Sequence, residues 1–484
     1  MKQVRSFFRG IGVLSTLWIA VCFSTTSLLY LSWVYRLTDF FDSTAVDAIS
    51  MVLGYGLQEA GIGLVCRLIR KNRSRLGPSF RWTLGCFLLI ASAAAFSSER
   101  IICLCAGLIM NLLCGMITGY YLDLPPQLVA EKQQGKSFGI GYALSVILVW
   151  LISLPGQGSL LRSRAAILIG VVLAVGAAWI PYLLKKNPDR EEEKENHQES
   201  TLSGKELGLA AGTVFLLSLV KNLGFSFPTA DVLAGMPLEL SRIFYAVGLV
   251  TAGVICDRNR RTGAICTVAA LGLPFMMLAL SGQPVSAFLC WSLDYLFYGF
   301  FSVFRVIVFW DLARERKQRW LAPMGLLAGR LGDAAGTAIC LALGAAPTVL
   351  ILLSMGLFIL TVFVSFRFFQ WQFEPSAVHP RGEQEIFEEF AMRHDLSPRE
   401  RDVLRLLLRE KTNAEIAENL YVSESTAKYH VHNLLQKTGC RNRGELLGEF
   451  KKLQYPALKD VGQKARVVNG NFPLDTASDR PEAE

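Results

Sequence analysis

Residues 101–122 read IICLCAGLIMNLLCGMITGYYL and contain no charged side chain. A run of about 20 apolar residues has the length that an α-helix needs to cross the hydrocarbon core of a bilayer. Similar runs recur along most of the chain: 52% of its 484 residues are hydrophobic, 18% are charged, and the mean hydropathy is +0.36. Soluble domains carry about 25% charged residues. The composition therefore argues against a soluble enzyme and predicts a membrane protein.

Twelve such stretches precede residue 370, and shorter apolar runs separated by charge follow it. We therefore predict an all-α fold: a twelve-helix transmembrane bundle, six plus six, followed by a small cytoplasmic four-helix domain. The predicted spans are 11–35, 44–66, 80–97, 101–122, 137–155, 165–184, 206–225, 239–256, 262–281, 285–309, 320–341 and 348–369.

The basic residues predict the orientation of these spans, because cytoplasmic loops accumulate Lys and Arg. Alternate connections, beginning with residues 1–10, hold 23 Lys and Arg, whereas the other connections hold 4. This places the N-terminus in the cytoplasm, and an even number of crossings returns the C-terminus there. We therefore expect a multi-pass protein of the cytoplasmic membrane with both termini inside.

Composition also divides the chain into segments. The charged stretch 185–205 is poor in apolar residues and reads as a connector between the two sets of six spans. The predicted organisation is a first membrane half (1–184), the connector (185–205), a second half (206–369), a linker with an amphipathic helix (370–393), a helical domain (394–453) and a disordered tail (454–484).

The turn after the eighth predicted span carries a loop motif, Gly253-Val-Ile-Cys-Asp257-Arg258-Asn-Arg260-Arg261. It resembles the loop motif of the major facilitator superfamily, in which a glycine is followed four residues later by Asp-Arg and further basic residues. The resemblance implies a twelve-helix transporter-type fold in which Gly253, Asp257, Arg258 and Arg261 act at the cytoplasmic face. Arg260 stands where that family usually has Gly, and Arg67 stands where Asp is expected in the first half. These departures put a working transport cycle in doubt.

Eight ionisable residues lie inside the predicted spans, where each costs about 2.5–3.5 kcal/mol at the bilayer centre unless it faces a partner or cavity. Two interpretations remain open: internal ion pairs that stabilise the bundle, or a site that senses a small molecule. Lys221 is the best single candidate for contacting an anionic ligand, and Arg330 and Asp333 are spaced to pair locally. One of the eight is Glu59. The other seven are the ligand-sensing candidates: Asp47, Lys221, Arg242, Asp294, Arg305, Arg330 and Asp333.

Catalysis and metal binding find little support in the sequence. All five histidines lie outside the spans, and the eleven cysteines read as ordinary thiols. The stretch Ala130–Ser137 loosely fits a phosphate-binding loop, but its neighbours are membrane helices and no strand is available to hold it. We expect no enzyme activity, no metal and no cofactor.

After the linker, helix-start signals become dense. Ser397-Pro-Arg-Glu400 and Thr412-Asn-Ala-Glu415 are capping boxes, Ser423 caps a third helix that ends at Gly439, and Asn442 precedes a fourth helix. The second and third helices are separated by only Tyr421, Val422 and the cap, which is typical of a helix-turn-helix. Ala427, Val431, Leu434 and Thr438 form the inward stripe of the third helix. Its outward face is then Glu424, Ser425, Lys428, Tyr429, His432 and Gln436, and all of these except Glu424 are candidates for contacting base edges or phosphates of DNA.

Residues 396–447 resemble the LuxR-type DNA-binding domain of bacterial transcription regulators. The matching positions are Leu396, Ser397, Arg399, Glu400, Val403, Leu404, Asn413, Glu415, Ile416, Ala417, Leu420, Ser423, Thr426, Lys428, His430, Asn433, Lys437 and Arg443. The resemblance implies that Thr426, Lys428, Lys437 and Arg443 contact double-stranded DNA and that the fourth helix serves dimerisation. Glu410, Ala427 and Thr438 depart from the family's usual glycine, valine and leucine. We therefore expect weak binding by the monomer and a homodimer on DNA.

Together these features favour a one-component membrane transcription regulator, in which the bundle senses an unknown small-molecule effector and the C-terminal domain binds a promoter. One alternative is a major facilitator-type transporter with an attached regulatory DNA-binding domain. Another is that the C-terminal helices dock onto a protein instead of DNA.

Overall fold

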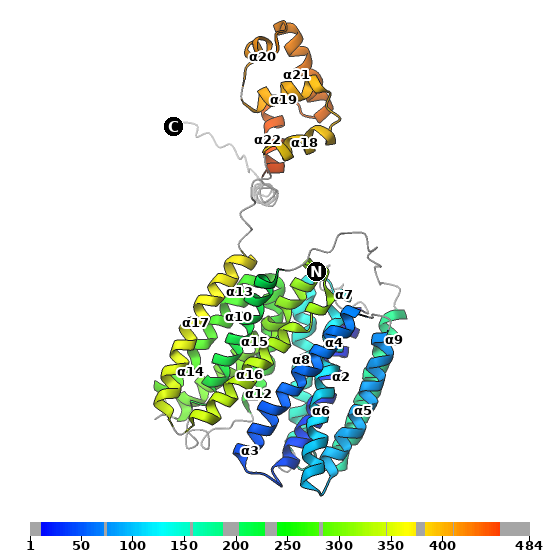
Figure 1. The fold of residues 1–484 in the computed structure, drawn as a ribbon, viewed down its shortest axis with the longest axis vertical. Coiled ribbons are helices and arrows are strands. Elements are labelled where there is room, and N and C mark those ends of the chain that lie inside the picture. The colour runs from blue at the N-terminus through cyan, green and yellow to red at the C-terminus, as the bar shows by residue number, and fades with distance from the viewer. Residues whose placement is uncertain are drawn as a thin grey trace, which may run out of the picture. The chain divides into compact units, whose positions relative to one another are not determined.

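The computed structural model describes residues 11–71, 75–154, 158–186, 203–227, 240–279, 284–344, 346–373, 383–409 and 411–454. Within these ranges the regular structure is helical, which confirms the all-α prediction (Figure 1). The chain divides into two compact units, Met1–Gln370 and Trp371–Glu484.

Helices, most of them long, make up the described part of the first unit. They are α2 (Ile11–Leu37), α3 (Ser43–Asp47), the π-helical η1 (Ala48–Gly54), α4 (Tyr55–Lys71), α5 (Leu76–Phe96), α6 (Arg100–Asp123), α7 (Pro125–Leu128), α8 (Glu131–Ser153), α9 (Arg164–Lys186), α10 (Gly204–Gly224), α12 (Ser241–Arg258), α13 (Arg260–Ala269), the 3-10 segment η5 (Ala270–Gly272), α14 (Leu273–Ala279), α15 (Pro284–Glu315), the 3-10 segment η6 (Arg319–Leu321), α16 (Met324–Leu343) and α17 (Pro347–Phe373).

Each of the twelve predicted spans corresponds to helix in this unit. Among the described residues, ten helices are long and apolar enough to cross a membrane. The exceptions are α12 and the span predicted at 262–281. The latter is not one continuous helix, because it is interrupted at η5, where Gly272 and Pro274 weaken helical hydrogen bonding.

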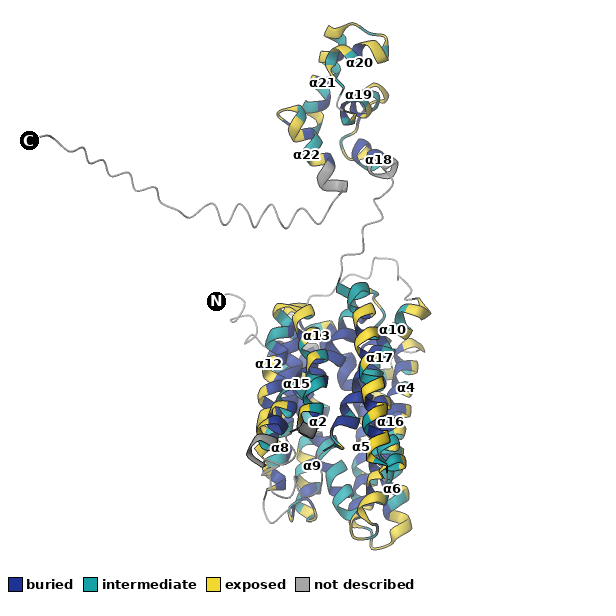
Figure 2. Cartoon of the chain, turned by 90° about the vertical axis from the view of Figure 1, so that its left-hand side faces the viewer, coloured by how far each residue is buried: buried dark blue, intermediate teal, exposed yellow. Residues whose placement is uncertain are grey.

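The surface of this bundle is apolar where a soluble protein would be polar. On α17, Leu352, Ile359 and Phe363 are exposed, and on α9 Val172 and Trp179 are exposed (Figure 2). Such a surface is stable in contact with lipid chains but not with water. The helices therefore form a multi-pass membrane domain.

The first six and last six spans meet mainly at α8 with α12 and at α4 with α16. Gly139 and Gly253 permit the first of these contacts. A Cβ atom on Gly139 would overlap the carbonyl of Leu249, and one on Gly253 would overlap the carbonyl of Gly135. The helix backbones thus approach closely, as small residues allow in membrane proteins.

The described part of the second unit contains five helices: α18 (Glu383–Arg393), α19 (Pro398–Leu408), α20 (Asn413–Leu420), α21 (Glu424–Thr438) and α22 (Arg443–Gln454). The last four begin within about a residue of their predicted starts, and α21 ends at the predicted Gly439. Glu410, one of the predicted departures from the family pattern, lies outside the described residues.

Candidate nucleic-acid interface and membrane site

Side-chain caps and one apolar core build the helix-turn-helix. The hydroxyls of Ser397, Thr412 and Ser423 accept hydrogen bonds from the backbone N–H of Glu400, Glu415 and Thr426. Because caps satisfy N–H groups that have no partner within the helix, they determine where each helix starts. Gly439 ends α21 with a φ of +71°.

The packing of α21 follows the predicted stripe. Ala427, Val431 and Leu434 are buried against α19 and α20. Thr438, in place of an apolar residue, donates its hydroxyl proton to the carbonyl of Leu434 at 2.9 Å or that of Leu435 at 3.2 Å. The hydroxyl is therefore satisfied within its own helix. The predicted outward residues are all exposed: Glu424, Ser425, Lys428, Tyr429, His432 and Gln436.

Hydroxyls gather at the N-terminal end of α21, the end that enters the major groove first in helix-turn-helix proteins. Ser423 Oγ lies 2.8 Å from Ser425 Oγ and 2.7 Å from Thr426 Oγ1. One turn further along, Lys428 Nζ lies 2.9 Å from Glu424 Oε1, in an exposed pair that contributes little stability. The surface therefore presents hydroxyl donors and an ammonium that changes partner at little cost.

Lys437 has contacts within the domain. Its ammonium lies 2.8 Å from Glu400 Oε2 and 3.1 Å from the carbonyl of Asp395, and it joins the end of α21 to the start of α19. Burial acts to raise the pKa of Glu400, but hydrogen bonds from Lys437 and Ser397 outweigh it and hold that pKa below its usual range. DNA contact by Lys437 stays a prediction.

Arg443 is also held within the domain. Its guanidinium donates to the carbonyl of Lys411 at 2.8 Å and to Asn413 Oδ1 at 2.9 Å. It thereby joins α22 to the N-terminal turn of α20. At that turn, hydrogen bonds from Thr412 and Lys411 lower the pKa of Glu415 to about 2. Arg443 thus positions α20, and DNA contact by its side chain stays a prediction.

Tyr421 is a surface residue that we did not select from the sequence. It follows α20 with φ +54° and ψ +45°, and its side chain is 96% exposed. Residues other than glycine rarely adopt this left-handed conformation. The sequence feature that could have indicated Tyr421 is its position in the short turn of the helix-turn-helix, two residues before the Ser423 cap.

The predicted amphipathic helix in the linker is α18, and it belongs to the same core. Phe387, Phe390 and Ala391 are buried with the apolar residues of α19 to α22. Glu388 pairs with Arg401 at 3.1 Å. The domain thus comprises five packed helices among its described residues, one more than the predicted four.

In the membrane unit, three ligand-sensing candidates form one ionic cluster. Asp333 on α16 lies 3.2 Å from Lys221 Nζ on α10 and 3.3 Å from Arg305 Nη1 on α15. All three are buried. The predicted local pairing of Asp333 with Arg330 is wrong, because the Asp333 carboxylate faces the neighbouring helices instead.

Aromatic rings surround Lys221. Its ammonium lies 3.8 Å from the ring centroid of Tyr298, 5.3 Å from that of Phe301 and 5.5 Å from that of Phe225. Such contacts stabilise a desolvated cation by about 2 kcal/mol. Lys221 therefore already has partners, and this contrasts with the expectation that it is the foremost ligand contact.

The other candidates are separate from this cluster or at its edge. Arg330 is half-buried, with its guanidinium carbon 5.4 Å from the ring centroid of Tyr55 on α4. Asp294 on α15 is buried. Asp47 is exposed at the end of α3, and Arg242 is half-buried at the start of α12. Asp47 and Arg242 therefore stay untested predictions.

The loop motif joins the two halves. Asp257 accepts hydrogen bonds from the backbone N–H of Gly135 at 2.7 Å and of Lys136 at 2.9 Å, both on α8. Arg260 donates to Asp311 at 2.8 Å and to the carbonyl of Glu131 at 3.0 Å. Arg258 and Arg261 are exposed. Arg260, which stands where the major facilitator motif usually has Gly, is thus the central basic residue of this contact.

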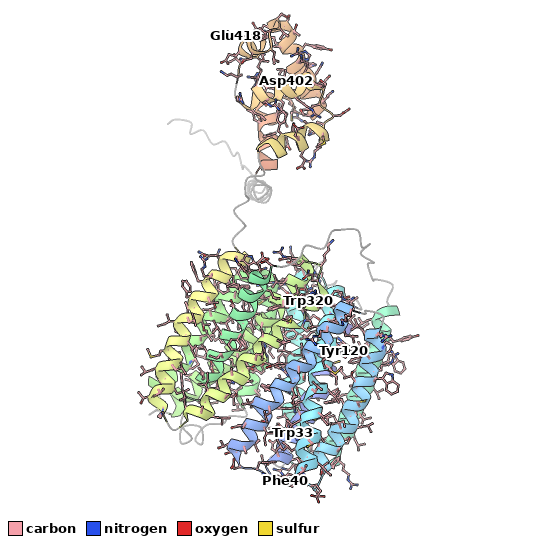
Figure 3. All side chains as sticks on the ribbon, in the orientation of Figure 1. Trp33, Phe40, Tyr120, Trp320, Asp402 and Glu418 are labelled. Atoms are coloured by element: carbon pink, nitrogen blue, oxygen red, sulfur yellow. The ribbon has the colours of Figure 1, made fainter. Side chains whose placement is uncertain are left out.

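More cross-half contacts lie near the ends of α6 and α15. Arg319 forms an ion pair with Asp123, and Arg314 donates to the carbonyls of Pro126 and Val129. Trp320, at this end of the bundle in Figure 3, lies 5.9 Å from the guanidinium of Arg70, whereas Phe40 lies at the opposite end. The two halves are therefore linked at the end that carries the basic connections.

Residues suited to metal binding do not cluster in the described part of the chain. No group of three or more His, Cys, Asp or Glu side chains there is placed to hold a metal ion. The eleven cysteines are free thiols.

The C-terminal domain is similar in sequence to known bacterial regulatory proteins. Residues 394–448 match the family model described as "Bacterial regulatory proteins, luxR family". The chain is 38% identical over 66 residues to the spore germination protein GerE of Bacillus subtilis, covering 14% of this chain and 89% of that protein. It is 42% identical over 52 residues to the nitrate/nitrite response regulator NarL of Escherichia coli, covering 11% of this chain and 24% of that one.

Solved membrane proteins resemble the larger part of the chain. The major facilitator superfamily transporter FucP, in its outward conformation, has a TM-score of 0.51 at 12% identity, covering 75% of this chain and 99% of that one. The nucleoside transporter NupG has a TM-score of 0.49 at 15% identity, covering 74% and 98%. The likeness to FucP concerns the fold alone.

Proposed function

Since the chain belongs to the luxR family of bacterial regulatory proteins through its C-terminal domain, and since that domain is fused to a major facilitator-like membrane fold, we propose that it is a one-component transcription regulator embedded in the membrane. The bundle binds a small-molecule effector, and the C-terminal domain binds a promoter in double-stranded DNA. It works without enzyme activity, metal or cofactor.

The exposed face of α21 is the observation that carries this proposal. Its buried stripe anchors the helix, while hydroxyl, ammonium, imidazole and amide groups point to solvent. These groups are the ones that contact phosphates and base edges in the major groove. The contacting residues are Ser425, Thr426, Lys428, Tyr429, His432 and Gln436, with Tyr421 beside them and Lys437 and Arg443 supporting the helix ends.

Effector control requires a ligand that prefers one arrangement of the two membrane halves. Their contacts through Asp257, Arg260 and Arg319 are polar and lie at one end of the bundle. The effector's preference for one arrangement must supply the free energy that separates them. A change there alters the freedom of the attached domain. Two copies of the domain then bind DNA as a homodimer, with both chain termini in the cytoplasm.

The direct test is DNA binding by purified full-length protein. Thr426→Ala and Lys428→Ala are expected to weaken binding to promoter DNA about tenfold each, and Lys428→Ala reduces the salt slope by about 1. Arg393→Ala is the matched control, because Arg393 is also exposed and paired with an acid four residues away, but on α18. Promoter DNA is obtained by sequencing genomic fragments that co-purify with the protein.

Unchanged binding in both α21 variants would contradict the assignment of this surface. Loss of a protein partner, with DNA binding intact, would support the docking-module alternative instead.

A transporter that also regulates is the second candidate function, and the linked halves and the likeness of fold favour it. It predicts that protein lacking residues 370–484 still moves a solute across vesicle membranes. If the protein is a regulator without transport activity, the protein lacking residues 370–484 moves no solute and no longer controls the promoter.

A further inference from the structure

Among the described residues, three charged side chains have a buried polar atom without a hydrogen-bond partner. These atoms are Glu59 Oε1 on α4, Arg305 Nε on α15 and Arg330 Nη1 on α16. Glu59 is only 6% exposed. A buried polar atom without a partner destabilises the folded protein, because it has lost its hydrogen bonds to water. Such groups in a packed membrane domain therefore point to a ligand that supplies the missing partners.

Glu59 and Arg330 belong to opposite halves of the bundle, and both lie beside Tyr55. Arg330 packs over the ring of Tyr55, and Glu59 is one helical turn from Tyr55 on the same face of α4. The helices α4 and α16 are in contact (Figure 1). The π-helical segment η1 leads directly into Tyr55 and also contacts α16. Such segments occur frequently at functional sites.

The neighbouring ion pairs restrict the chemistry of the ligand. Lys221 and Arg305 share Asp333, so those charges already have a partner. Besides Arg305 Nε, the groups without a partner are one guanidinium nitrogen of Arg330, which donates to an anion, and one carboxyl oxygen of Glu59, which accepts from a cationic donor. A simple anion would leave Glu59 unpaired, and a simple cation would leave Arg330 unpaired.

We infer that the effector is a small zwitterion of the amino-acid class, whose carboxylate binds Arg330 and whose ammonium binds Glu59. This inference rests on the proposed sensing function and specifies its ligand. Because the two contacts come from different halves, a molecule that makes both favours the arrangement in which α4 and α16 are close. The effector thereby acts on the contact between the halves, where control of the attached domain originates.

The experiment measures the thermal unfolding midpoint of full-length protein in a maltoside detergent. The probe is a mixture of free amino acids, compared with the same mixture after N-acetylation and after methyl esterification. The free mixture is expected to raise the Tm, and either modification is expected to remove the shift, because each removes one charge. Glu59→Gln and Arg330→Gln should each abolish the shift while the ligand-free Tm stays the same or rises.

Asp333→Asn is the matched control for a structural role, since it breaks a satisfied buried ion pair and is expected to lower the ligand-free Tm. A similar drop in Glu59→Gln or Arg330→Gln would overturn the inference, because it would show that these groups stabilise the bundle. Equal shifts from the acetylated or esterified mixture, or no shift from any mixture, would also overturn it. DNA binding by the same preparation without amino acids tests the proposed regulator independently.

Discussion

Tyr421 combines two properties that stability alone does not favour. A left-handed conformation costs a residue with a Cβ roughly 1–2 kcal/mol, and an exposed aromatic ring gains little from packing. Yet Tyr421 adopts φ +54° and is 96% exposed, in the turn that leads to the recognition helix α21. Backbone strain of this kind concentrates at functional sites.

We therefore predict opposite effects for Tyr421→Gly. The stability of the domain rises by up to about 1 kcal/mol, because glycine adopts positive φ without a steric penalty, while the affinity for promoter DNA falls several-fold. Hydrogen exchange of α20 and α21 in the full chain, together with a DNA titration, measures both. A variant that loses stability and keeps its affinity would assign Tyr421 a structural role.

Glu400 makes the domain sensitive to acid. Its pKa is lowered in the folded state, so its contribution to stability is fully present above the unfolded-state pKa of about 4.3 and is lost as the pH falls through the lower folded value. Protection of α19 amides, corrected for intrinsic exchange, is expected to fall over that acidic range. Glu400→Gln, which keeps an acceptor for the Ser397 N–H, should flatten this pH dependence. An unchanged pH profile in the variant would show that other titrating groups cause it.

At the scale of elements, the helices of the C-terminal domain were predictable because their signals are local. Capping boxes at Ser397 and Thr412, the Ser423 cap and Gly439 determine starts and ends within a few residues of sequence. The role of α18 was not predictable to the same degree. Its amphipathic pattern indicates a buried face, but only folding shows that this face packs against α22, where Phe390 meets Phe450 at 5.5 Å.

Phe390 is expected to be essential to this packing. It is 1% exposed, and Phe390→Ala should destabilise the domain by about 3–5 kcal/mol because it leaves a cavity. This is a large part of the stability of a small domain. Met392→Ala is the control, since Met392 is 68% exposed. Comparable hydrogen exchange of α19 and α22 in the two variants would show that α18 is dispensable for the core.

At the scale of the whole molecule, topology determines whether the domain can reach a chromosome. With 23 Lys and Arg in one set of connections and 4 in the other, a reporter that is active only in the cytoplasm should be active when fused after Glu484. A fusion after residue 42, in a predicted outer connection, should be active only with an external reporter. Activity of the external reporter at Glu484 would exclude promoter binding by this chain.

Membrane spans, helix caps and the inward stripe of α21 follow from residues that are close together along the chain, because hydropathy, capping and helical periodicity are local effects. The partners of buried charges follow different physics. Lys221 and Asp333 are 112 positions apart, and Asp257 reaches the backbone of α8 across 122. Only tertiary packing brings such groups together. A buried charge is stable only when it has a partner, and the packing of the helices determines which partner lies beside it.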